Sequence, residues 1–253
     1  MGKFDGILLA TDLDGTLLKT DKTVSPLNAE AIRYFQSEGG LFTAATGRYP
    51  DFLNTYTDFF KVNECVIGLN GNMIYDLSNK KMLFVSKMEK DALKNVIDYM
   101  MSAFGNFISF TDINAENEMY HYEGVLKCNP SKAVVVTDSA QSALKIKADL
   151  TKKYGHLYKF VRSWDVGLEI FDIKSGKGEC IDYIKKYVNP NIRKTVCVGD
   201  YENDISMLTH ADIGYAVKNA VSDVKAVADK ITEVDNNNDA IAWVINDLEK
   251  EGI

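Results

Sequence analysis

Short apolar runs, each followed at once by polar residues or glycine, are the feature that most constrains how this chain folds. Three occur in its first part, at Ile7–Thr11, Leu41–Ala45 and Cys65–Leu69. Uninterrupted runs of this length are typical of strands buried on both faces. Between the first two lies a predicted helix with Ser25 as N-cap and Pro26 as its first residue. This alternation of strand and helix predicts an α/β fold with a parallel sheet.

The same alternation returns in the last part of the chain. It predicts a helix from about Lys177 to Tyr187, a strand at Thr195–Val198, a helix over Glu202–Thr209, a strand at Ile213–Val217 and a helix from about Asn238 to Lys250. The two α/β parts therefore form one domain, made of residues 1–82 and 175–253.

The middle of the chain, residues 83–174, has a different pattern. Strands that follow one another in sequence favour antiparallel pairing, so this segment reads as an inserted α+β domain. The pattern predicts helices from about Lys87 to Ala103 and from Ser139 to Tyr154, and strands at Phe107–Phe110, Lys132–Thr137, Leu157–Arg162 and Leu168–Ile173; Met119–Lys127 is ambiguous.

Composition excludes several classes of partner. Acidic residues outnumber basic ones by 36 to 29, and the net charge of −7 argues against a nucleic acid or an anionic membrane. No apolar run reaches the roughly 18 residues that a membrane span needs. The sequence has no feature that points to a protein partner. No CxxC pair occurs, and we expect a reduced, cytoplasmic protein; its cysteines are Cys65, Cys128, Cys180 and Cys197.

Carboxylates follow two of the predicted strands. Asp12 and Asp14 come after the first apolar run, and Asp200 and Asp204 come after Thr195–Val198. Because the carboxyl ends of parallel strands line the ligand crevice of an open sheet, these acids are expected to converge. Oxygen ligands of this kind suit Mg²⁺, whose charge also offsets their mutual repulsion.

The spacing of Asp12 and Asp14 is chemically informative. Side chains at i and i+2 of an extended stretch point the same way, so both carboxylates can face one small site. One carboxylate can attack phosphorus, and the other can protonate the leaving oxygen and later activate water. A solvated turn also accounts for such a pair on its own, but the preceding buried strand favours the catalytic interpretation.

Three further residues fall at positions where they can bind phosphate. Thr46 and the Gly47 amide follow the second strand, and Lys177 opens a helix. Hydrogen-bond donors and a lysine ammonium both stabilise a transferring phosphoryl group. Taken singly, Thr46 is better explained as a cap and Lys177 as a solvated charge, so the functional interpretation depends on their positions at the strand and helix ends.

In order, four segments of the sequence resemble the motifs of the haloacid-dehalogenase-like phosphatases: Asp12-Leu13-Asp14-Gly15-Thr16, Thr46-Gly47-Arg48, Lys177-Gly178 and Gly199-Asp200-Tyr201-Glu202-Asn203-Asp204. The later segments Ala211–Val217, Asn219-Ala220 and Ala228-Asp229 resemble the Cof-type branch, subfamily IIB. The resemblance covers the whole chain. It implies a Rossmann-like parallel-sheet core with an inserted cap domain of the C2B type.

The resemblance also implies roles for individual residues. Asp12 would be the nucleophile and Asp14 the general acid and base. Mg²⁺ would be held by the Asp12 carboxylate, the Asp14 backbone carbonyl and Asp200, while Asp204 would support the metal through water or orient Lys177. The phosphate group would be held by the Leu13 amide, Thr46, Gly47, Lys177 and Asn203.

Three other residues are candidates for substrate contacts. Arg48 and Asn70 follow strand ends on the predicted catalytic face, where a structural role in the loops is equally open. Glu169 lies in the insert and leads back toward the core, so it is a candidate for contact with a sugar hydroxyl.

These observations favour a Mg²⁺-dependent phosphatase that acts on a small phosphate monoester through an aspartyl-phosphate on Asp12. The resemblance points to a sugar phosphate or a phosphorylated cofactor as substrate. A phosphosugar mutase on the same scaffold is one alternative, but it needs a second phosphate site, and Arg162 is the only arginine in the insert. The other is a non-catalytic regulator that accepts a phosphoryl group, which would need neither Asp14 nor so large an insert.

Overall fold

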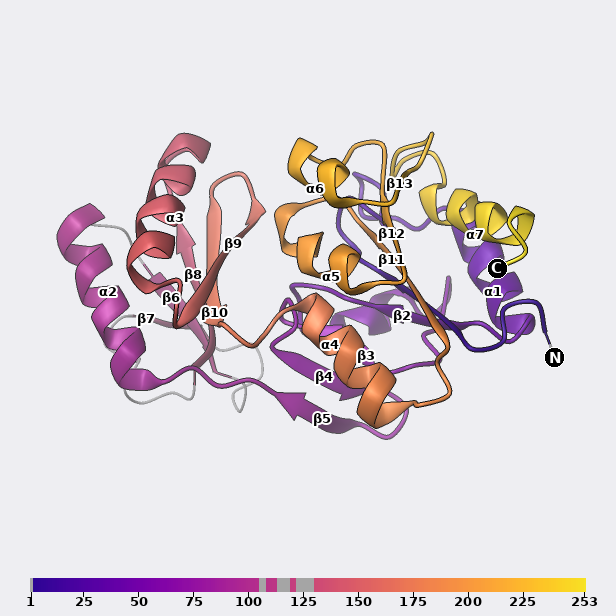
Figure 1. Ribbon diagram of the computed structural model, residues 1–253, viewed down its shortest axis with the longest axis horizontal. Helices are drawn as coiled ribbons and strands as arrows, with labels where there is room; N and C mark the ends of the chain where they lie inside the picture. The colour runs from indigo at the N-terminus through magenta and orange to yellow at the C-terminus, as the bar shows by residue number, and fades with distance from the viewer. Residues whose placement is uncertain (1, 105–107, 113–118, 122–129) are drawn as a thin grey trace. The chain divides into compact units, whose positions relative to one another are not determined.

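A computed structural model describes residues 2–104, 108–112, 119–121 and 130–253. The chain divides into two compact units (Figure 1). The core unit comprises Met1–Leu83 and Gly176–Ile253, and the inserted unit comprises Phe84–Ser175. No helix among the described residues is long and apolar enough to cross a membrane.

The core unit is built on a five-stranded parallel sheet in the order β13-β12-β11-β1-β2. Every residue of β1, which lies between β11 and β2, is buried, as its uninterrupted apolar run predicts. The strand order reverses between β1 and β11, which is where ligands bind in open parallel sheets. The strands are β1 (Ile7–Thr11), β2 (Leu41–Ala44), β11 (Lys194–Gly199), β12 (Ile213–Ala216) and β13 (Lys230–Ile231).

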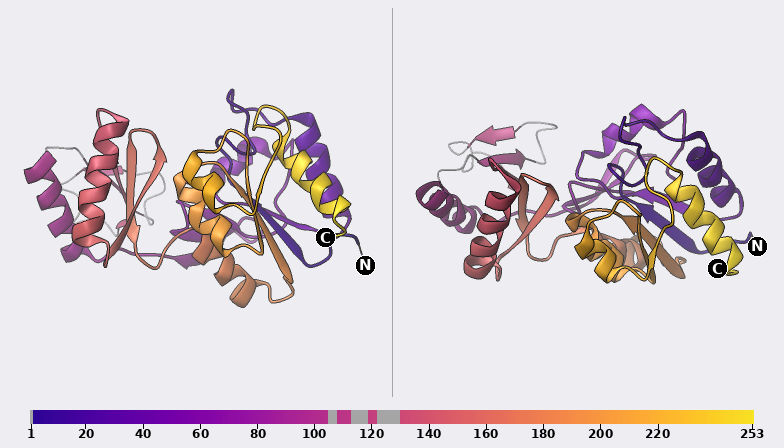
Figure 2. Two further views of the ribbon diagram at one scale, coloured as in Figure 1. Left: turned by 45° about the horizontal axis from the view of Figure 1, so that its top comes forward. Right: turned by 90° about the horizontal axis from the view of Figure 1, so that it is seen from above.

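Helices of the core unit pack against one another in pairs. Helix α1 lies against α7, and α4 lies against α5 (Figure 2). Ser25 caps α1 as predicted, because its Oγ accepts hydrogen bonds from the amides of Leu27 and Asn28. These elements are α1 (Pro26–Ser37), α4 (Lys177–Tyr183, continued by a π-helix at Ile184–Val188), the 3₁₀ helix η4 (Glu202–Asp204), α5 (Ile205–His210), α6 (Ser222–Val227) and α7 (Ala240–Lys250).

The third apolar run does not join the parallel sheet as a full strand. It forms β3 (Val66–Gly68), which pairs with β4 (Met73–Asp76) in a separate antiparallel sheet completed by β5 (Lys81–Val85). A single parallel bridge from Ala45 to Ile67 connects it to the end of β2. The reason is a tight reversal at Leu69-Asn70-Gly71, where all three residues have positive φ, so the chain turns back without a crossover helix. A 3₁₀ helix, η1 (Pro50–Tyr56), precedes β3.

The inserted unit is an antiparallel five-stranded sheet in the order β7-β6-β8-β10-β9, packed with two helices. The predicted α/β fold with a parallel core sheet and an inserted α+β module is thereby confirmed. The elements are α2 (Lys90–Phe104), β6 (Ile108–Asp112), β7 (Met119–His121), β8 (Pro130–Val136), α3 (Ala140–Tyr154), β9 (Tyr158–Trp164) and β10 (Gly167–Asp172). The rest of the ambiguous segment after His121, and Cys128, lie outside the described residues.

Apolar side chains of α2 and α3 form the core of this unit with one face of the sheet. Leu93, Ile97 and Met100 of α2 are fully buried against Leu168 and Ile170 of β10. Alternate residues of the strands face this core, as expected for a sheet covered on one side by helices.

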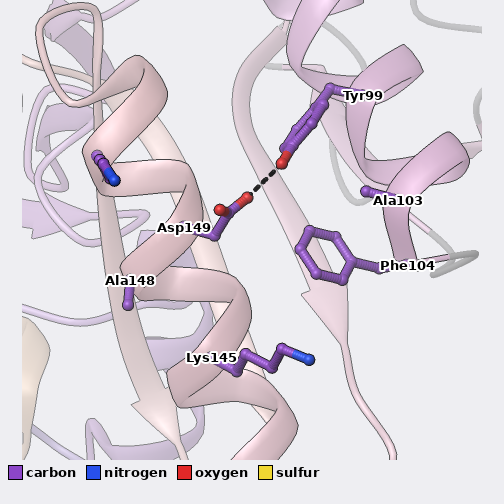
Figure 3. A pocket seen from close by; sticks show the side chains of 7 residues that line it. Tyr99, Ala103, Phe104, Lys145, Ala148 and Asp149 are labelled. Atoms are coloured by element: carbon purple, nitrogen blue, oxygen red, sulfur yellow. Dashed lines mark hydrogen bonds between the residues drawn. The ribbon is translucent and has the colours of Figure 1, made fainter.

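A hollow of about 460 Å³ opens between α2 and α3 (Figure 3). Two alanines, Ala103 and Ala148, leave the space, and the Tyr99 hydroxyl donates a 2.5 Å hydrogen bond to Asp149 Oδ2 beside it. None of the predicted site residues lines this hollow. Its lining residues are Tyr99, Ala103, Phe104, Lys145, Ala148, Asp149 and Lys152.

Candidate active site

Three carboxylates meet at the reversal point of the core sheet. Asp12 follows β1, Asp200 follows the neighbouring strand β11, and Asp204 lies in η4. Their oxygens lie within 4.8 Å of one another. The loop approaches so closely that a Cβ on Gly15, at φ +85°, would lie 2.4 Å from Asp200 Oδ2. Glycine is therefore required there, on both steric and conformational grounds.

A wholly buried lysine joins two of these acids. Lys177 Nζ lies 2.6 Å from Asp12 Oδ1 and 2.6 Å from Asp204 Oδ1. The other oxygen of Asp204 accepts hydrogen bonds from the Asp200 and Tyr201 amides, at 2.9 and 3.1 Å. Asp204 thus contacts both the lysine and the backbone of the loop that carries Asp200.

Burial and crowding perturb the pKa values of these groups. Desolvation raises the pKa of Asp12 to about 7, with Lys177 opposing and Asp204 adding to the shift. Desolvation and the Asp12 and Asp204 charges raise the pKa of Asp200 well above its usual value. Burial alone would lower the pKa of Lys177, but its two carboxylate partners outweigh that effect and raise it.

The charges of this cluster suit a divalent cation. Three carboxylates share one ammonium group, so ionisation of all three leaves an excess of negative charge in a buried site. The donors are all oxygens, the ligand type that Mg²⁺ prefers. The residues therefore fit the predicted metal by both charge and donor chemistry.

Asp14 points into a different set of contacts. Its carboxylate accepts two hydrogen bonds from Arg48, from Nε at 2.8 Å and Nη2 at 3.0 Å, and a third from Lys22 Nζ at 2.7 Å. Burial would raise the pKa of Asp14, but these hydrogen bonds outweigh it and lower the pKa. The guanidinium of Arg48 also lies over the Phe52 ring, 4.0 Å from its centre.

Residues predicted to bind phosphate adjoin Asn70, whose backbone amide donates to the Thr46 carbonyl at 2.9 Å. Asn203 Nδ2 donates to Asn70 Oδ1 at 3.0 Å, and a Cβ on Gly47 would lie 3.0 Å from Asn70 Nδ2. Thr46 is buried after β2, and its Oγ1 accepts a hydrogen bond from the Arg48 amide. Asn203 Oδ1 is buried without a hydrogen-bond partner in the described part of the chain.

Leu13 is fully buried between the two aspartates. Glu169 belongs to the inserted unit, where it lies in β10 and is 3% exposed. Its Oε1 lies 3.2 Å from Nζ of the equally buried Lys132. A substrate contact by Glu169 therefore stays a prediction.

Sequence reasoning missed three residues of this region. Thr16 Oγ1 donates to Asp200 Oδ1 at 2.7 Å, and Asn219 Nδ2 donates to the Gly15 carbonyl at 2.8 Å. The third is Lys22, whose backbone has a positive φ. Thr16 and Asn219 lie within the motifs quoted above, and membership of those motifs was the sequence signal that could have identified them. Nothing in the sequence pattern marks Lys22, because its contact with Asp14 depends on the folded loop.

Known proteins resemble this chain in sequence and in fold. The family model of the haloacid dehalogenase-like hydrolases matches residues 9–132 and 115–245. A phosphatase of Bacillus subtilis is 26% identical, with 95% of this chain and 99% of the relative covered. A 5-amino-6-(5-phospho-D-ribitylamino)uracil phosphatase of the same species is 24% identical, with 95% and 97% covered.

The solved structure of a sugar phosphatase of subclass IIB superposes with a TM-score of 0.80 at 20% identity, covering 97% of this chain and 99% of that one. A HAD/COF-like hydrolase from Plasmodium vivax gives a TM-score of 0.81 at 21% identity, covering 99% and 97%. The matches span the core unit and the inserted unit alike. The chain therefore belongs to the haloacid dehalogenase-like hydrolases, in their Cof-type branch, and it is a phosphatase of that family.

Proposed function

We propose that this chain hydrolyses a small phosphate monoester in a Mg²⁺-dependent reaction through an aspartyl-phosphate on Asp12. The observation that carries the proposal is the buried cluster of Asp12, Asp200 and Asp204 around the fully buried Lys177. Keeping so many charges out of water is costly, and perturbed carboxyl groups of this kind are characteristic of catalytic sites.

The carboxylates of Asp12 and Asp200 and the backbone carbonyl of Asp14 would hold Mg²⁺. When bound, the ion offsets the negative charge of the cluster and polarises a phosphoryl oxygen. Lys177 supplies a second positive charge at Asp12, and Asp204 orients the ammonium group of Lys177.

The reaction proceeds in two displacements at phosphorus. A carboxylate oxygen of Asp12 attacks phosphorus, the bond to the leaving oxygen breaks, and that oxygen takes a proton from Asp14. In the second step water attacks the aspartyl-phosphate, Asp14 accepts the proton of that water, and inorganic phosphate leaves with Asp12 restored. Throughout, the phosphate oxygens are held by the amides of Leu13 and Gly47 and the side chains of Thr46, Lys177 and Asn203.

The hydrogen bonds that Asp14 makes in this structure suit its role in the second of these steps. Arg48 and Lys22 stabilise its ionised form, which is the form that accepts a proton from water. Donation of a proton to the leaving group requires the protonated form, so Asp14 exchanges these partners during turnover. Arg48 is thereby assigned to the control of Asp14 in addition to its expected place near the substrate.

The substrate class is proposed from the relatives. They include a phosphatase for a phosphorylated ribitylaminouracil and a sugar phosphatase. Both names describe a phosphate on a polyhydroxylated carbon chain, and alkoxide leaving groups of this type need the proton that Asp14 supplies. We therefore place sugar phosphates first and phosphorylated cofactor intermediates second.

The test is phosphate release from a panel of sugar phosphates, sugar-alcohol phosphates, nucleotides and phosphorylated cofactors. Each compound is assayed with Mg²⁺, with a chelator and with the Asp12→Asn variant. The proposal expects release that needs Mg²⁺ and disappears in Asp12→Asn. Turnover by Asp12→Asn at the wild-type rate, or undiminished turnover in chelator, would overturn it.

A further inference from the structure

Two asparagines of the C-terminal part of the chain form a hydrogen-bonded brace on the loop that follows β1. Asn219 Nδ2 donates to the Gly15 carbonyl at 2.8 Å, and Asn236 Nδ2 donates to the Leu18 carbonyl at 2.9 Å. The two are joined to each other, because the Asn236 amide donates to Asn219 Oδ1 at 3.0 Å. The brace therefore holds two separate points of the loop that carries Asp12 and Asp14.

The same segment also holds the loop that carries Asp200. The Val221 amide donates to the Asp200 carbonyl at 3.0 Å, only two positions after Asn219. Asp200 in turn accepts a hydrogen bond from Thr16 Oγ1 at 2.7 Å. Residues 219–221 thus contact the backbone of both loops that supply the acidic cluster.

The two asparagines differ in their surroundings. Asn236 is 4% exposed, whereas Asn219 is exposed to solvent. Removal of the Asn236 side chain would leave the buried Leu18 carbonyl without its hydrogen-bond donor, which destabilises the folded state. Asn219 is exposed and its partner Gly15 is half-buried, so we expect the folded state to tolerate loss of the Asn219 side chain better than loss of Asn236.

Asn219 acts next to a backbone group that the proposed function uses. Its amide holds the Gly15 carbonyl, one residue beyond the Asp14 carbonyl that would bind Mg²⁺. Gly15 has a positive φ and no Cβ, so its backbone has more conformational freedom than any other residue there. A hydrogen bond at this position restricts that freedom.

We propose that Asn219, held in place by Asn236, is a positioning residue that fixes the Asp14–Gly15 backbone relative to Asp200 and thereby sets the affinity for Mg²⁺. This inference rests on the proposed function. Outer partners of metal ligands typically change metal affinity by about 10-fold to 100-fold when they are removed. We expect Asn219→Ala to weaken Mg²⁺ binding about 10-fold.

The test is a calorimetric titration of Mg²⁺ into the metal-free, full-length protein, wild type and Asn219→Ala. Asn238→Ala is the matched control, because among the described residues Asn238 Nδ2 donates to Asp235 Oδ1 alone, at 2.7 Å within the same loop. Circular dichroism and thermal unfolding establish that each variant is folded. Phosphate release is measured in parallel against Mg²⁺ concentration.

The inference expects weaker Mg²⁺ binding in Asn219→Ala alone, a matching rise in the Mg²⁺ concentration for half-maximal activity, and a kcat near the wild-type value at saturating Mg²⁺. Equal affinity in Asn219→Ala and wild type overturns the inference and leaves the proposed function standing. Equal losses in Asn219→Ala and Asn238→Ala also overturn it. Absence of Mg²⁺ binding by the wild type overturns the proposed function itself.

Discussion

At the scale of single residues, the acidic cluster was the most predictable part of the site. Asp12 and Asp200 follow apolar runs that form adjacent parallel strands, so their convergence follows from the strand pattern. The partners of Asp14 were not predictable in this way. Arg48 was a candidate for substrate contact, yet its guanidinium binds Asp14 in the structure. That pairing depends on how two loops fold over each other, which no local pattern encodes.

Lys177 is the residue whose loss should disturb the core unit most. Its ammonium group compensates two carboxylates in a buried site, and removing one partner of a buried ion pair costs about 3–5 kcal/mol. We expect Lys177→Met to lower the free energy of unfolding by about that amount at pH 7.5 in metal-free buffer, as measured by urea denaturation. Lys174→Met, at an exposed lysine three positions earlier in the sequence, is the control. Equal stability of the two variants would contradict the assignment.

Arg48 should make stability depend on pH through Asp14. The folded-state pKa of Asp14 is lowered, so its contribution is present above the unfolded-state pKa of about 3.9 and is lost as pH falls through the folded-state value. Arg48→Gln should therefore be less stable than wild type near pH 7, with a difference that shrinks in acid. Thermal unfolding across this range provides the measurement. Arg33→Gln should show no such trend, because the Arg33 guanidinium donates to the Phe59 carbonyl and to no carboxylate in the described part of the chain.

At the scale of elements, most strands were predicted, including β9 with its partly exposed residues, whereas β4 and β5 were not. Strands β1 and β12 could be identified from the sequence because each is a short apolar run bounded by loops. Strands β4 and β5 were missed, since β5 is exposed or half-exposed along its length and carries no buried pattern. The prediction that β3 joins the parallel sheet was wrong because the positive φ angles at Leu69 and Asn70 reverse the chain. Such angles are uncommon in residues other than glycine, so the sequence does not indicate them.

Ser25 offers a test of how one element end is stabilised. Its Oγ caps α1 and also donates to Asp239, the residue that precedes α7. Loss of an N-cap side chain typically costs about 1 kcal/mol, and the second partner adds to this. We expect Ser25→Ala to lower the free energy of unfolding by about 1–2 kcal/mol in a urea titration. Ser37→Ala, at the exposed end of the same helix, should change it far less.

At the scale of the whole molecule, the acidic cluster couples stability to pH and to metal. The pKa values of Asp12 and Asp200 are raised in the folded state, so that state binds their protons more tightly than the unfolded chain does. The free energy of unfolding of the metal-free protein therefore falls as pH rises from about 4 toward 7. A ligand that binds only the folded state reverses this loss.

We expect Mg²⁺ to raise the melting temperature of the wild type near pH 7.5 relative to the same protein in chelator. Asp200→Asn should melt higher than wild type in chelator, because one of the repelling charges is gone, and should gain little from Mg²⁺. Scanning calorimetry of both proteins with and without Mg²⁺ measures this. If the melting temperature of the wild type is the same with Mg²⁺ and with chelator, the proposed metal site is contradicted.

The strand pairing of β1 determines how late the core sheet can be completed during synthesis. β1 pairs with β2, which follows soon after it, and with β11, from which the whole inserted unit separates it. During synthesis the inserted unit is complete, with its own apolar core, before the ribosome has produced β11. Until then β1 has one unpaired edge, the kind of edge that invites association with other chains. The nascent protein thus assembles its acidic cluster as one of its last folding events, and a chain released early from the ribosome carries Asp12 without Asp200 and Asp204.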